Sequence, residues 1–446
     1  MRRGVILLVA ALCWLLPTGS CLCGEGPVEA PQNQTNAVLA GKATPGIVLV
    51  SPREGSVVPI ISESQKAFVR MAPADRDVLI ENIERRKAVL HAAGCRPQPV
   101  TLAWSCAKPG CDGLKYAVEV KRMPDGKTVL ARTTGRTELA VDNLEVATRY
   151  RWTVTAETRS GQPLKGVGMF QTEDGVPRLV RINGVPNVRD LGGRIGLNGR
   201  RVRQGLVFRS AGLNTNACKC YSREEIMKMY KAGTLLSAVP ERSRPEAQKV
   251  REAIASNRIG RATFNHLVKE WTPGKPRMKA ADIREALATF GFRTDIDLRT
   301  DRECYGMAES PLGPSVNWVH VSSCAYSELL TDAGRDAFAR VLRVFLDERN
   351  YPIDFHCIAG ADRTGTVAYV LGALLGYSEA DLLLDWELTA FCSSSSDFKR
   401  KTRYDKLVAA FAEFPGTCAR ERVEGFVLSL GFSDADISRF RGIMLE

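Results

Sequence analysis

Two patterns of apolar and polar positions divide the chain into an all-β part and an α/β part. Residues 95–174 contain short runs in which apolar and polar side chains alternate, such as 100–104 and 116–120, and this alternation is typical of half-buried strands. From residue 175 onward, strand-like apolar runs alternate with longer segments of helical periodicity, an order typical of α/β folds. We therefore expect an all-β domain at residues 95–174 and an α/β domain at residues 175–446.

The N-terminal region has the composition of an export signal followed by a linker. Two arginines precede an apolar segment at residues 4–16, and small residues follow it, as in secretory signal peptides. We predict a signal peptide at residues 1–23 and an exported protein that is periplasmic, at the cell surface or secreted; a lipid-modified Cys21 is an alternative. Residues 24–94 are interpreted as a leader or linker. No later apolar stretch has the length of a membrane span.

Charge and cysteine content narrow the classes of partner and cofactor. The formal net charge is +12, but the basic residues are scattered, so we expect anionic substrates rather than nucleic acid. The chain has 13 cysteines and only 4 histidines, which argues against a zinc site, and we expect no metal and no organic cofactor. If the compartment is oxidising, Cys106 and Cys111 are spaced to close a small loop, and Cys218 and Cys220 are further candidates for disulfides.

The strongest chemical signal lies where a strand-like run meets a helix-like run. An apolar stretch at residues 351–355 leads to Cys357, and Arg363 follows after five residues, just before the helix-like segment 366–371. Backbone N–H groups of such a loop and the N-terminus of the helix form a site for an anion. This environment lowers the pKa of a thiol from its ordinary value of about 8.5, and the planar guanidinium of Arg363 can hold two phosphoryl oxygens. The loop therefore predicts phosphoryl transfer through a phosphocysteine.

The sequence from His356 to Gly365, His-Cys-Ile-Ala-Gly-Ala-Asp-Arg-Thr-Gly, resembles the signature loop of the protein tyrosine phosphatase superfamily. It is similar to the His-Cys-x-Ala-Gly-x-Asp-Arg-Thr-Gly loop of the bacterial tyrosine/dual-specificity branch. Ala361 departs from the lysine that is usual in that branch. The resemblance implies an α/β cysteine-phosphatase fold, with a central, mostly parallel sheet flanked by helices. It also implies a substrate that is a phosphorylated protein or a small phosphomonoester.

The same resemblance implies a role for each residue of the loop. Cys357 is the expected nucleophile, Arg363 is the expected phosphate ligand, and Thr364 is expected to hydrogen-bond the sulfur as it leaves. The general acid is open between Asp362 in the loop and Asp297 in a strand-borne Asp-Leu-Arg motif. For each carboxylate, the alternative is a charge partnership with a neighbouring arginine. The remaining phosphate-binding candidates are the loop residues Ile358, Ala359, Gly360 and Ala361.

Further motifs are similar to elements of this family. Arg189 and Asp190 lie in Asn-Val-Arg-Asp-Leu-Gly-Gly, where they either contact the substrate or form a structural salt bridge. Arg299 ends the Asp-Leu-Arg motif and is a candidate for substrate binding. His356 is expected to hydrogen-bond behind the nucleophile rather than to act as an acid. Residues 213–280 form a longer connection than the family usually has, and the sequence leaves open a lid, a specificity insertion or a docking surface.

The all-β part carries a second resemblance. Residues 144–154, Leu-Glu-Val-Ala-Thr-Arg-Tyr-Arg-Trp-Thr-Val, resemble the corner motif of fibronectin type III domains, with Val146 where proline is usual. The resemblance implies a β-sandwich in which Tyr150 forms the tyrosine corner and in which Trp104 and Trp152 pack between the sheets. We expect such a domain to dock a partner.

Together these patterns favour a cysteine-dependent phosphomonoester hydrolase, a protein tyrosine or dual-specificity phosphatase acting through a phosphocysteine. A phosphoinositide or inositol-phosphate phosphatase is one alternative, although Ala361 removes the lysine charge that a multiply phosphorylated head group would contact. A catalytically silent phosphate-binding module is another, and the intact Cys357, Arg363 and Thr364 argue against it. A serine hydrolase lacks the Gly-x-Ser-x-Gly motif that would support it.

Overall fold

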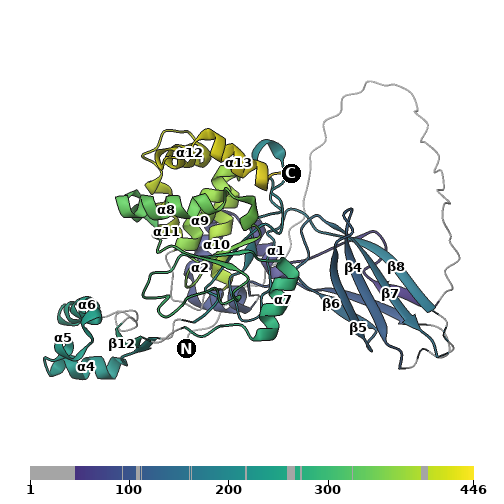
Figure 1. The fold of residues 1–446 in the computed structure, drawn as a ribbon, viewed down its shortest axis with the longest axis horizontal. Coiled ribbons are helices and arrows are strands. Elements are labelled where there is room, and N and C mark those ends of the chain that lie inside the picture. The colour runs from purple at the N-terminus through teal and green to yellow at the C-terminus, as the bar shows by residue number, and fades with distance from the viewer. Residues whose placement is uncertain are drawn as a thin grey trace, which may run out of the picture. The chain divides into compact units, whose positions relative to one another are not determined.

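The computed structural model describes residues 46–92, 94–106, 111, 113–159, 161, 163–215, 218–258, 267–271, 274–323, 325–392 and 400–446 (Figure 1). The predicted signal peptide at residues 1–23 and the first part of the predicted leader lie outside the described residues. Among the helices within the described ranges, none combines the length and apolar character needed to cross a bilayer.

Two β-sheets in the N-terminal half share one apolar core. The core includes Trp104 and Trp152, the two tryptophans expected to pack between the sheets. The hydroxyl of Tyr150 accepts a hydrogen bond from the backbone N–H of Glu145 at 2.8 Å, the contact expected of a tyrosine corner. The sheet orders are β1-β3-β6 and β2-β8-β7-β4-β5. The strands are β1 (Ile47–Ser51), β2 (Ser56–Val58), β3 (Val100–Cys106), β4 (Tyr116–Met123), β5 (Thr128–Thr134), β6 (Glu138–Val141), β7 (Arg149–Glu157) and β8 (Pro163–Thr172).

The sheets take two strands from residues that the sequence assigned to the leader at 24–94. β1 pairs with β3, and β2 pairs with β8, so the first strand begins at Ile47 rather than at residue 95. β2 has only three residues, none of them buried, and such a short exposed strand leaves almost no alternating pattern in a sequence.

Helices follow these two strands, and they pack on the α/β part of the chain. Phe68, Ile80 and Leu90 lie in one buried cluster with Leu388 and Phe391. The first helix begins with a capping box in which Ser62 and Gln65 exchange hydrogen bonds. The predicted leader thus folds against the rest of the protein. Its helical elements are α1 (Glu63–Arg70), α2 (Pro73–Glu81), α3 (Ile83–Arg85) and the π-helical η1 (Arg86–His91).

The α/β part is built on a five-stranded, mostly parallel sheet, which confirms the predicted fold class. The order is β14-β13-β15-β10-β9, and only the pairing of β9 with β10 is antiparallel. The register places Ser210, Asp297 and His356 side by side at the ends of their strands. These C-terminal ends form the edge at which α/β proteins bind ligands. The strands are β9 (Arg189–Asp190), β10 (Val207–Ser210), β13 (Thr294–Asp297), β14 (Asn317–His320) and β15 (Ile353–His356).

Helix α9 is the central helix of this part. Every residue from Thr364 to Leu374 is buried, as expected of a helix that is apolar on all sides. A Cβ atom at Gly365 would lie 2.5 Å from the ring of Trp386, so only glycine allows this close approach. The helices are α7 (Ala280–Phe290), α8 (Asp332–Val344), α9 (Arg363–Leu374), α10 (Glu379–Glu387), α11 (Arg400–Ala410), α12 (Ala419–Ser429) and α13 (Asp434–Met444).

The long connection predicted at residues 213–280 contains a small unit with its own core. Its ends lie together, because the Thr215 N–H donates to the Lys275 carbonyl oxygen at 2.8 Å. The elements are β11 (Cys218–Cys220), α4 (Arg223–Lys231), α5 (Leu235–Ala238), α6 (Arg244–Ala255) and β12 (Val268–Trp271). The core side chains are Ile226, Leu235, Val239, Ala247, Val250 and Leu267.

Two disulfides lie in the described part of the chain. Cys106–Cys111 closes the small loop that its spacing predicted. Cys95–Cys392 spans 297 residues and joins the end of the N-terminal helical segment to the α/β part. Local spacing gave no signal for this second bridge, because its cysteines meet only through the tertiary fold.

Candidate active site

The nucleophile candidate Cys357 follows directly after β15, at the C-terminal edge of the sheet. Cys357 is 3 % exposed. The loop that follows it ends at Arg363, where α9 begins. Gly360 has a φ of +65°, and a Cβ atom there would lie 2.4 Å from the carbonyl oxygen of Ser210. Glycine is therefore required for the loop to turn tightly against β10.

The surroundings of the Cys357 sulfur favour its thiolate form. Burial raises the pKa of the Cys357 thiol, but the positive charge of Arg363 lowers it. The neighbouring Thr364 hydroxyl and the backbone N–H groups of Thr364 and Ala361 lower this pKa further, and the net result lies below the ordinary thiol value. A thiolate at the N-terminus of a helix is the form that attacks phosphorus.

Arg363 is held beside the loop by the carboxylate of Glu303, which was not one of the predicted site residues. Its Nη1 donates to Glu303 Oε2 at 2.7 Å and its Nη2 donates to Oε1 at 3.2 Å. The Leu298 carbonyl oxygen accepts a further bond from Nη1 at 3.2 Å. Glu303 lies six residues after Asp297, in the residues that directly follow the Asp-Leu-Arg motif. This motif was the available signal, and the bidentate pair fixes the plane of the guanidinium.

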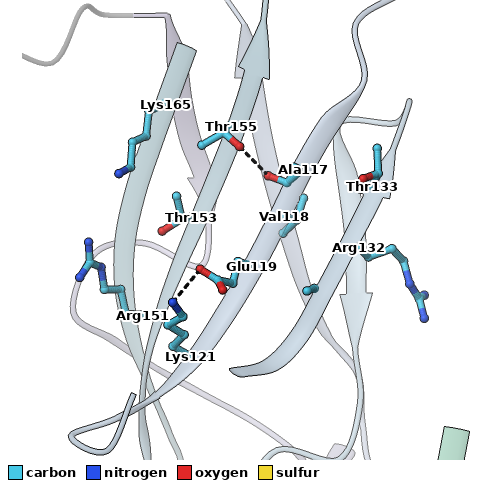
Figure 2. A pocket seen from close by; sticks show the side chains of 11 residues that line it. Ala117, Val118, Glu119, Lys121, Arg132, Thr133, Arg151, Thr153, Thr155 and Lys165 are labelled. Atoms are coloured by element: carbon cyan, nitrogen blue, oxygen red, sulfur yellow. Dashed lines mark hydrogen bonds and ion pairs between the residues drawn. The ribbon is translucent and has the colours of Figure 1, made fainter. Parts of the chain in front are cut away.

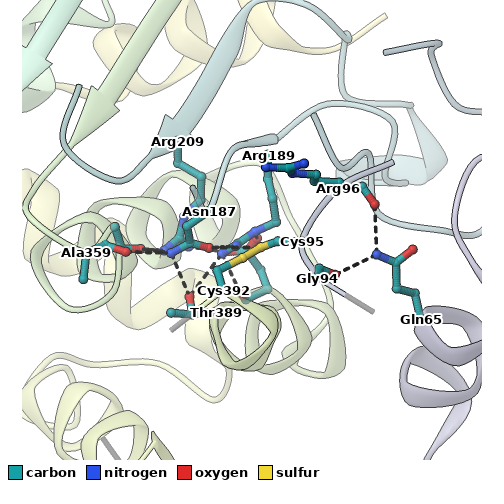
Figure 3. Close-up of a disulfide and its surroundings, with 12 residues drawn as sticks. Gln65, Gly94, Cys95, Arg96, Asn187, Arg189, Arg209, Ala359, Thr389 and Cys392 are labelled. Carbon is teal, nitrogen blue, oxygen red and sulfur yellow. Dashed lines mark hydrogen bonds and ion pairs between the residues drawn. A yellow bond between two sulfur atoms is a disulfide. The ribbon is translucent and has the colours of Figure 1, made fainter. Parts of the chain in front are cut away.

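Two side chains hold the back of the loop through its carbonyl groups (Figure 3). Asn187 Nδ2 donates to the carbonyl oxygens of Ala359 at 2.9 Å and Gly360 at 3.0 Å. Arg209 Nη2 donates to the same Gly360 oxygen at 2.6 Å. Because these carbonyl groups are tied back, the N–H groups of the loop are turned to the opposite side, where an oxyanion would bind. Neither Asn187 nor Arg209 was predicted as a site residue, although Asn187 begins the Asn-Val-Arg-Asp-Leu-Gly-Gly motif.

Arg189 has a structural role, not the substrate contact that was one of its two predicted roles. It is 1 % exposed, and its Nε donates to Asp385 Oδ1 at 3.1 Å, while its Nη1 donates to Asn187 Oδ1. Arg209 donates to the other oxygen of Asp385. Burial raises the pKa of Asp385, but the charges of Arg209 and Arg189 hold it well below its usual range. Asp385 thus links both arginines behind the loop.

Asp190 is likewise a structural residue. Its Oδ2 accepts from Arg178 at 2.5 Å and from the Gly205 N–H at 2.6 Å, and its Oδ1 accepts from the Gly192 N–H at 2.7 Å. The side chain is fully buried. These contacts place Asp190 in a buried salt bridge, one of its two predicted roles.

Asp297 and Arg299 form a closed buried pair. Arg299 donates to Asp297 through Nε at 2.8 Å and through Nη2 at 2.5 Å, and both side chains are inaccessible to solvent. Burial raises the pKa of Asp297, but the charges of His356 and Arg299 hold it well below its usual range. A buried carboxylate that stays ionised is a poor proton donor. The pairing therefore argues against Asp297 as the acid and against Arg299 as a substrate ligand.

His356 lies behind the nucleophile, as its predicted role requires. Its Nδ1 is 3.2 Å from the Cys357 carbonyl oxygen, and its Nε2 is 3.0 Å from Asp295. Burial lowers the pKa of His356, but the charges of Asp297 and Asp295 raise it to about 9. The imidazole is therefore protonated at neutral pH and belongs to the buried support of the loop.

Asp362 is the candidate carboxylate that reaches solvent, with 32 % of its side chain exposed. It accepts a hydrogen bond from the Tyr326 hydroxyl at 2.5 Å and pairs with Arg403 at 2.8 Å and Arg400 at 3.3 Å. Tyr326 has a φ of +59°, an unfavourable conformation for a bulky residue that is found mostly at functional sites. The contact with Tyr326 fixes the carboxylate next to the loop.

Comparison with known proteins supports this site. Residues 180–225 and 275–446 match the model of the tyrosine phosphatase family, and the match includes the whole loop from Cys357 to Thr364. It is interrupted between residues 225 and 275, within the connection predicted to exceed the family length. No curated protein matches the chain.

Proposed function

The chain belongs to the tyrosine phosphatase family and is a phosphatase, and we propose that it hydrolyses phosphomonoesters, phosphotyrosine in proteins above all, through a phosphocysteine. The observation that carries this proposal is the position of Cys357 between β15 and the N-terminus of α9, where the charge of Arg363 lowers the pKa of its thiol. The sulfur sits within a loop whose carbonyl groups are tied back by Asn187 and Arg209. This combination provides a nucleophile and an oxyanion site at one point.

In the first step, the Cys357 thiolate attacks phosphorus and the bond from phosphorus to the leaving oxygen breaks. Arg363 and the N–H groups of Ile358, Ala359, Gly360 and Ala361 stabilise the three other phosphoryl oxygens. Protonated Asp362 gives its proton to the leaving oxygen, because an alkoxide or phenoxide is otherwise a poor leaving group. The products are the dephosphorylated alcohol or phenol and a phosphocysteine.

In the second step, water attacks the phosphocysteine. The Asp362 carboxylate takes a proton from the water as the new oxygen–phosphorus bond forms, and the sulfur–phosphorus bond breaks. The Cys357 thiolate leaves with a hydrogen bond from Thr364. Inorganic phosphate departs, and both Cys357 and Asp362 return to their starting states.

Hydrolysis of a phosphotyrosine peptide and of p-nitrophenyl phosphate tests the proposal. Cys357→Ser should abolish both activities, because the serine hydroxyl stays protonated at neutral pH. Cys418→Ser is the matched control, since Cys418 is an unpaired, half-buried cysteine at the start of α12, and it should retain full activity. Turnover by Cys357→Ser at the wild-type rate would overturn the assignment.

Charge around Asp362 favours a second class of substrate. Arg400 and Arg403 bring two positive charges to this carboxylate, and they partly replace the lysine that Ala361 lacks. Phosphoinositides and inositol phosphates are therefore the second candidate. Parallel assays of phosphopeptides, phosphoinositide vesicles and inositol phosphates at equal concentration discriminate the two by kcat/KM.

We further infer the domain scheme and the compartment. A signal peptide at residues 1–23 precedes a segment at 24–94, which supplies β1 and β2 to the sheets and helices that pack on the α/β part. A fibronectin type III-like domain at 95–174 and the phosphatase domain at 175–446 follow. The hydrogen bond between Tyr150 and Glu145 supports the fibronectin-like assignment. The two disulfides support export, because disulfides persist in oxidising compartments. Mass spectrometry of the mature N-terminus after expression in a secreting host tests the scheme.

The all-β domain offers a docking surface for an acidic partner. A hollow of about 580 Å³ lies on its five-stranded sheet (Figure 2). Binding to a polyglutamate column should weaken with salt and with Arg151→Glu, while phosphatase activity stays unchanged. Retention of the Arg151→Glu variant at the wild-type salt concentration would contradict this proposal. The charged side chains that line the hollow are Lys121, Arg132, Arg151 and Lys165, opposed by the single acidic side chain of Glu119.

A further inference from the structure

The Cys95–Cys392 disulfide lies directly behind the catalytic loop (Figure 3). Cys95 follows the N-terminal helical segment, and Cys392 follows the 3-10 helix η7 (Leu388–Phe391). The two Cα atoms are 5.4 Å apart, within the usual range for a disulfide. The bridge thus fastens the N-terminal segment to the element that ends beside the loop.

One residue separates this disulfide from the loop. The Sγ atom of Cys95 lies 3.9 Å from Asn187 Oδ1, and Asn187 Nδ2 donates to the carbonyl oxygens of Ala359 and Gly360. The Thr389 hydroxyl of η7 lies 3.5 Å from the same Nδ2 atom. Asn187 has a φ of +61°, so its side chain is aimed by a backbone conformation that needs support from its neighbours.

The N-terminal segment also contacts the neighbouring helix α10 through a buried ion pair. Arg76 Nε donates to Glu387 Oε2 at 2.5 Å, and the two side chains are 5 % and 1 % exposed. Two residues earlier, Asp385 holds Arg189 and Arg209 behind the loop. The segment before residue 95 therefore covers the same helix that positions these arginines, and the disulfide closes its end.

We propose that the Cys95–Cys392 disulfide is a positioning element of the phosphatase, which acts on the catalytic loop through Asn187. The active enzyme then needs cysteines in two oxidation states: Cys95 and Cys392 joined in a disulfide, and Cys357 as a reduced thiolate. This inference rests on the proposed function, because it assigns the bridge a part in the same reaction. Reduction by a dithiol gives two thiols at positions 95 and 392 and one cyclic disulfide of the reductant, with two electrons and two protons transferred.

The test compares two double variants. Cys95→Ala with Cys392→Ala removes the proposed positioning bridge, and Cys106→Ala with Cys111→Ala removes the bridge of the all-β domain. Both are assayed after a mild reduction and desalting that return Cys357 to its thiol and leave the remaining disulfides oxidised, as mass spectrometry of each sample verifies. We expect kcat to fall at least tenfold in the first variant, with the midpoint of Cys357 alkylation by iodoacetamide moved to higher pH. The second variant should match the wild type in both measurements.

The pH dependence of Cys357 alkylation separates a change in the catalytic loop from a general loss of stability. A variant that is less stable but still folded, with its loop intact, keeps the wild-type alkylation midpoint. Asn187→Ala supplies the second arm, since it breaks the relay and leaves the bridge in place. If Asn187 transmits the effect, the variant that combines all three substitutions should lose no more activity than the larger of the two separate losses. Additive losses, or a wild-type kcat and alkylation midpoint without the bridge, would overturn the proposal.

Failure of the proposed function gives a different result. In that case the wild-type enzyme would turn over none of the phosphate esters, whereas the alkylation midpoint and the affinity for vanadate still report on the loop. A shifted midpoint in the Cys95→Ala and Cys392→Ala variant would then support the coupling by itself.

Discussion

Two charged clusters flank the catalytic loop, and they differ in their access to water. The inner cluster consists of Asp385, Arg189 and Arg209, and its guanidinium groups are almost fully buried. The mouth cluster consists of Asp362, Tyr326, Arg400 and Arg403, and the carboxylate of Asp362 is 32 % exposed. Both clusters pair a carboxylate with two arginines, but the side chain of Asp362 is 32 % exposed and that of Asp385 is 13 % exposed.

The difference separates positioning from chemistry. A buried carboxylate with two arginine partners stays ionised and fixed, since losing either partner would leave an uncompensated charge. Ion pairs are weaker and screened where they are exposed, and the proposed general acid Asp362 is the more exposed of the two carboxylates. The Asp297–Arg299 pair is buried like the inner cluster, which argues against Asp297 as the general acid.

The largest expected effect is on the mouth cluster. Asp362→Asn should lower kcat about 10²- to 10⁴-fold for phenyl phosphate, the usual contribution of a general acid. The loss should be much smaller for p-nitrophenyl phosphate, whose leaving group needs little protonation. Steady-state kinetics over a series of aryl phosphates measures the dependence on the leaving group. Equal losses across the series would assign Asp362 to charge pairing alone.

The inner cluster should show its loss mainly in stability. Asp385→Asn leaves Arg189 and Arg209 without a counter-charge, and we expect the free energy of unfolding to fall by about 3–5 kcal/mol. Asp405→Asn is the matched control, because it breaks an exposed ion pair with Lys401 that contributes about 0.5 kcal/mol. Urea denaturation followed by fluorescence compares them. A loss at Asp385 no larger than at Asp405 would contradict the distinction between the clusters.

A pH-dependent stability is expected from His356, whose pKa is raised from its ordinary 6.5 to about 9 by Asp297 and Asp295. Because the folded pKa is the higher one, the stabilisation is complete below pH 6.5 and is lost as the pH rises through 9. Over this window we expect a loss of roughly 2–3 kcal/mol. Denaturation in a Cys357→Ser background avoids the titration of the thiol. His356→Gln should flatten the curve; an equal slope in both would refute the assignment.

The smallest effect is expected from adding one positive charge next to the mouth cluster. Ala361→Lys restores the cation that is usual at this loop position and adds a third positive charge beside Arg400 and Arg403. We expect KM for an inositol phosphate to fall about fivefold, a gain of about 1 kcal/mol, with little change for a phosphotyrosine peptide. Equal changes for the two substrates would show that the cations do not select multiply phosphorylated groups.

Local sequence predicted the features that depend on neighbouring residues. The strand, the small-residue loop and the helix around Cys357 are contiguous, and so are the residues that close the Cys106–Cys111 loop. The mostly parallel sheet followed from the family resemblance carried by the same contiguous loop. These features need no knowledge of the tertiary fold, which is why a single chain sufficed to predict them.

Pairings between distant residues were not accessible in this way. Asp385 lies 196 residues from Arg189 and carries no motif of its own, and Cys95 and Cys392 meet only after the N-terminal segment has folded onto α10 and η7. For Arg189, Asp190 and Asp297, the sequence singled out the residue but left its role open. A charged residue near a site serves structure or chemistry according to burial, and burial is set by the whole fold.

The hydrogen bond between Thr215 and Lys275 has a consequence for the architecture of the chain. The connection at residues 213–280 starts and ends at neighbouring positions and has its own apolar core. It therefore has the properties of a small domain inserted into the phosphatase domain. Replacing the inserted unit with two glycine residues should leave the rest of the phosphatase domain folded. Another small domain whose ends lie close together should be tolerated at the same position. An accessory domain can thus be gained or exchanged at this position without a change in the residues that position Cys357.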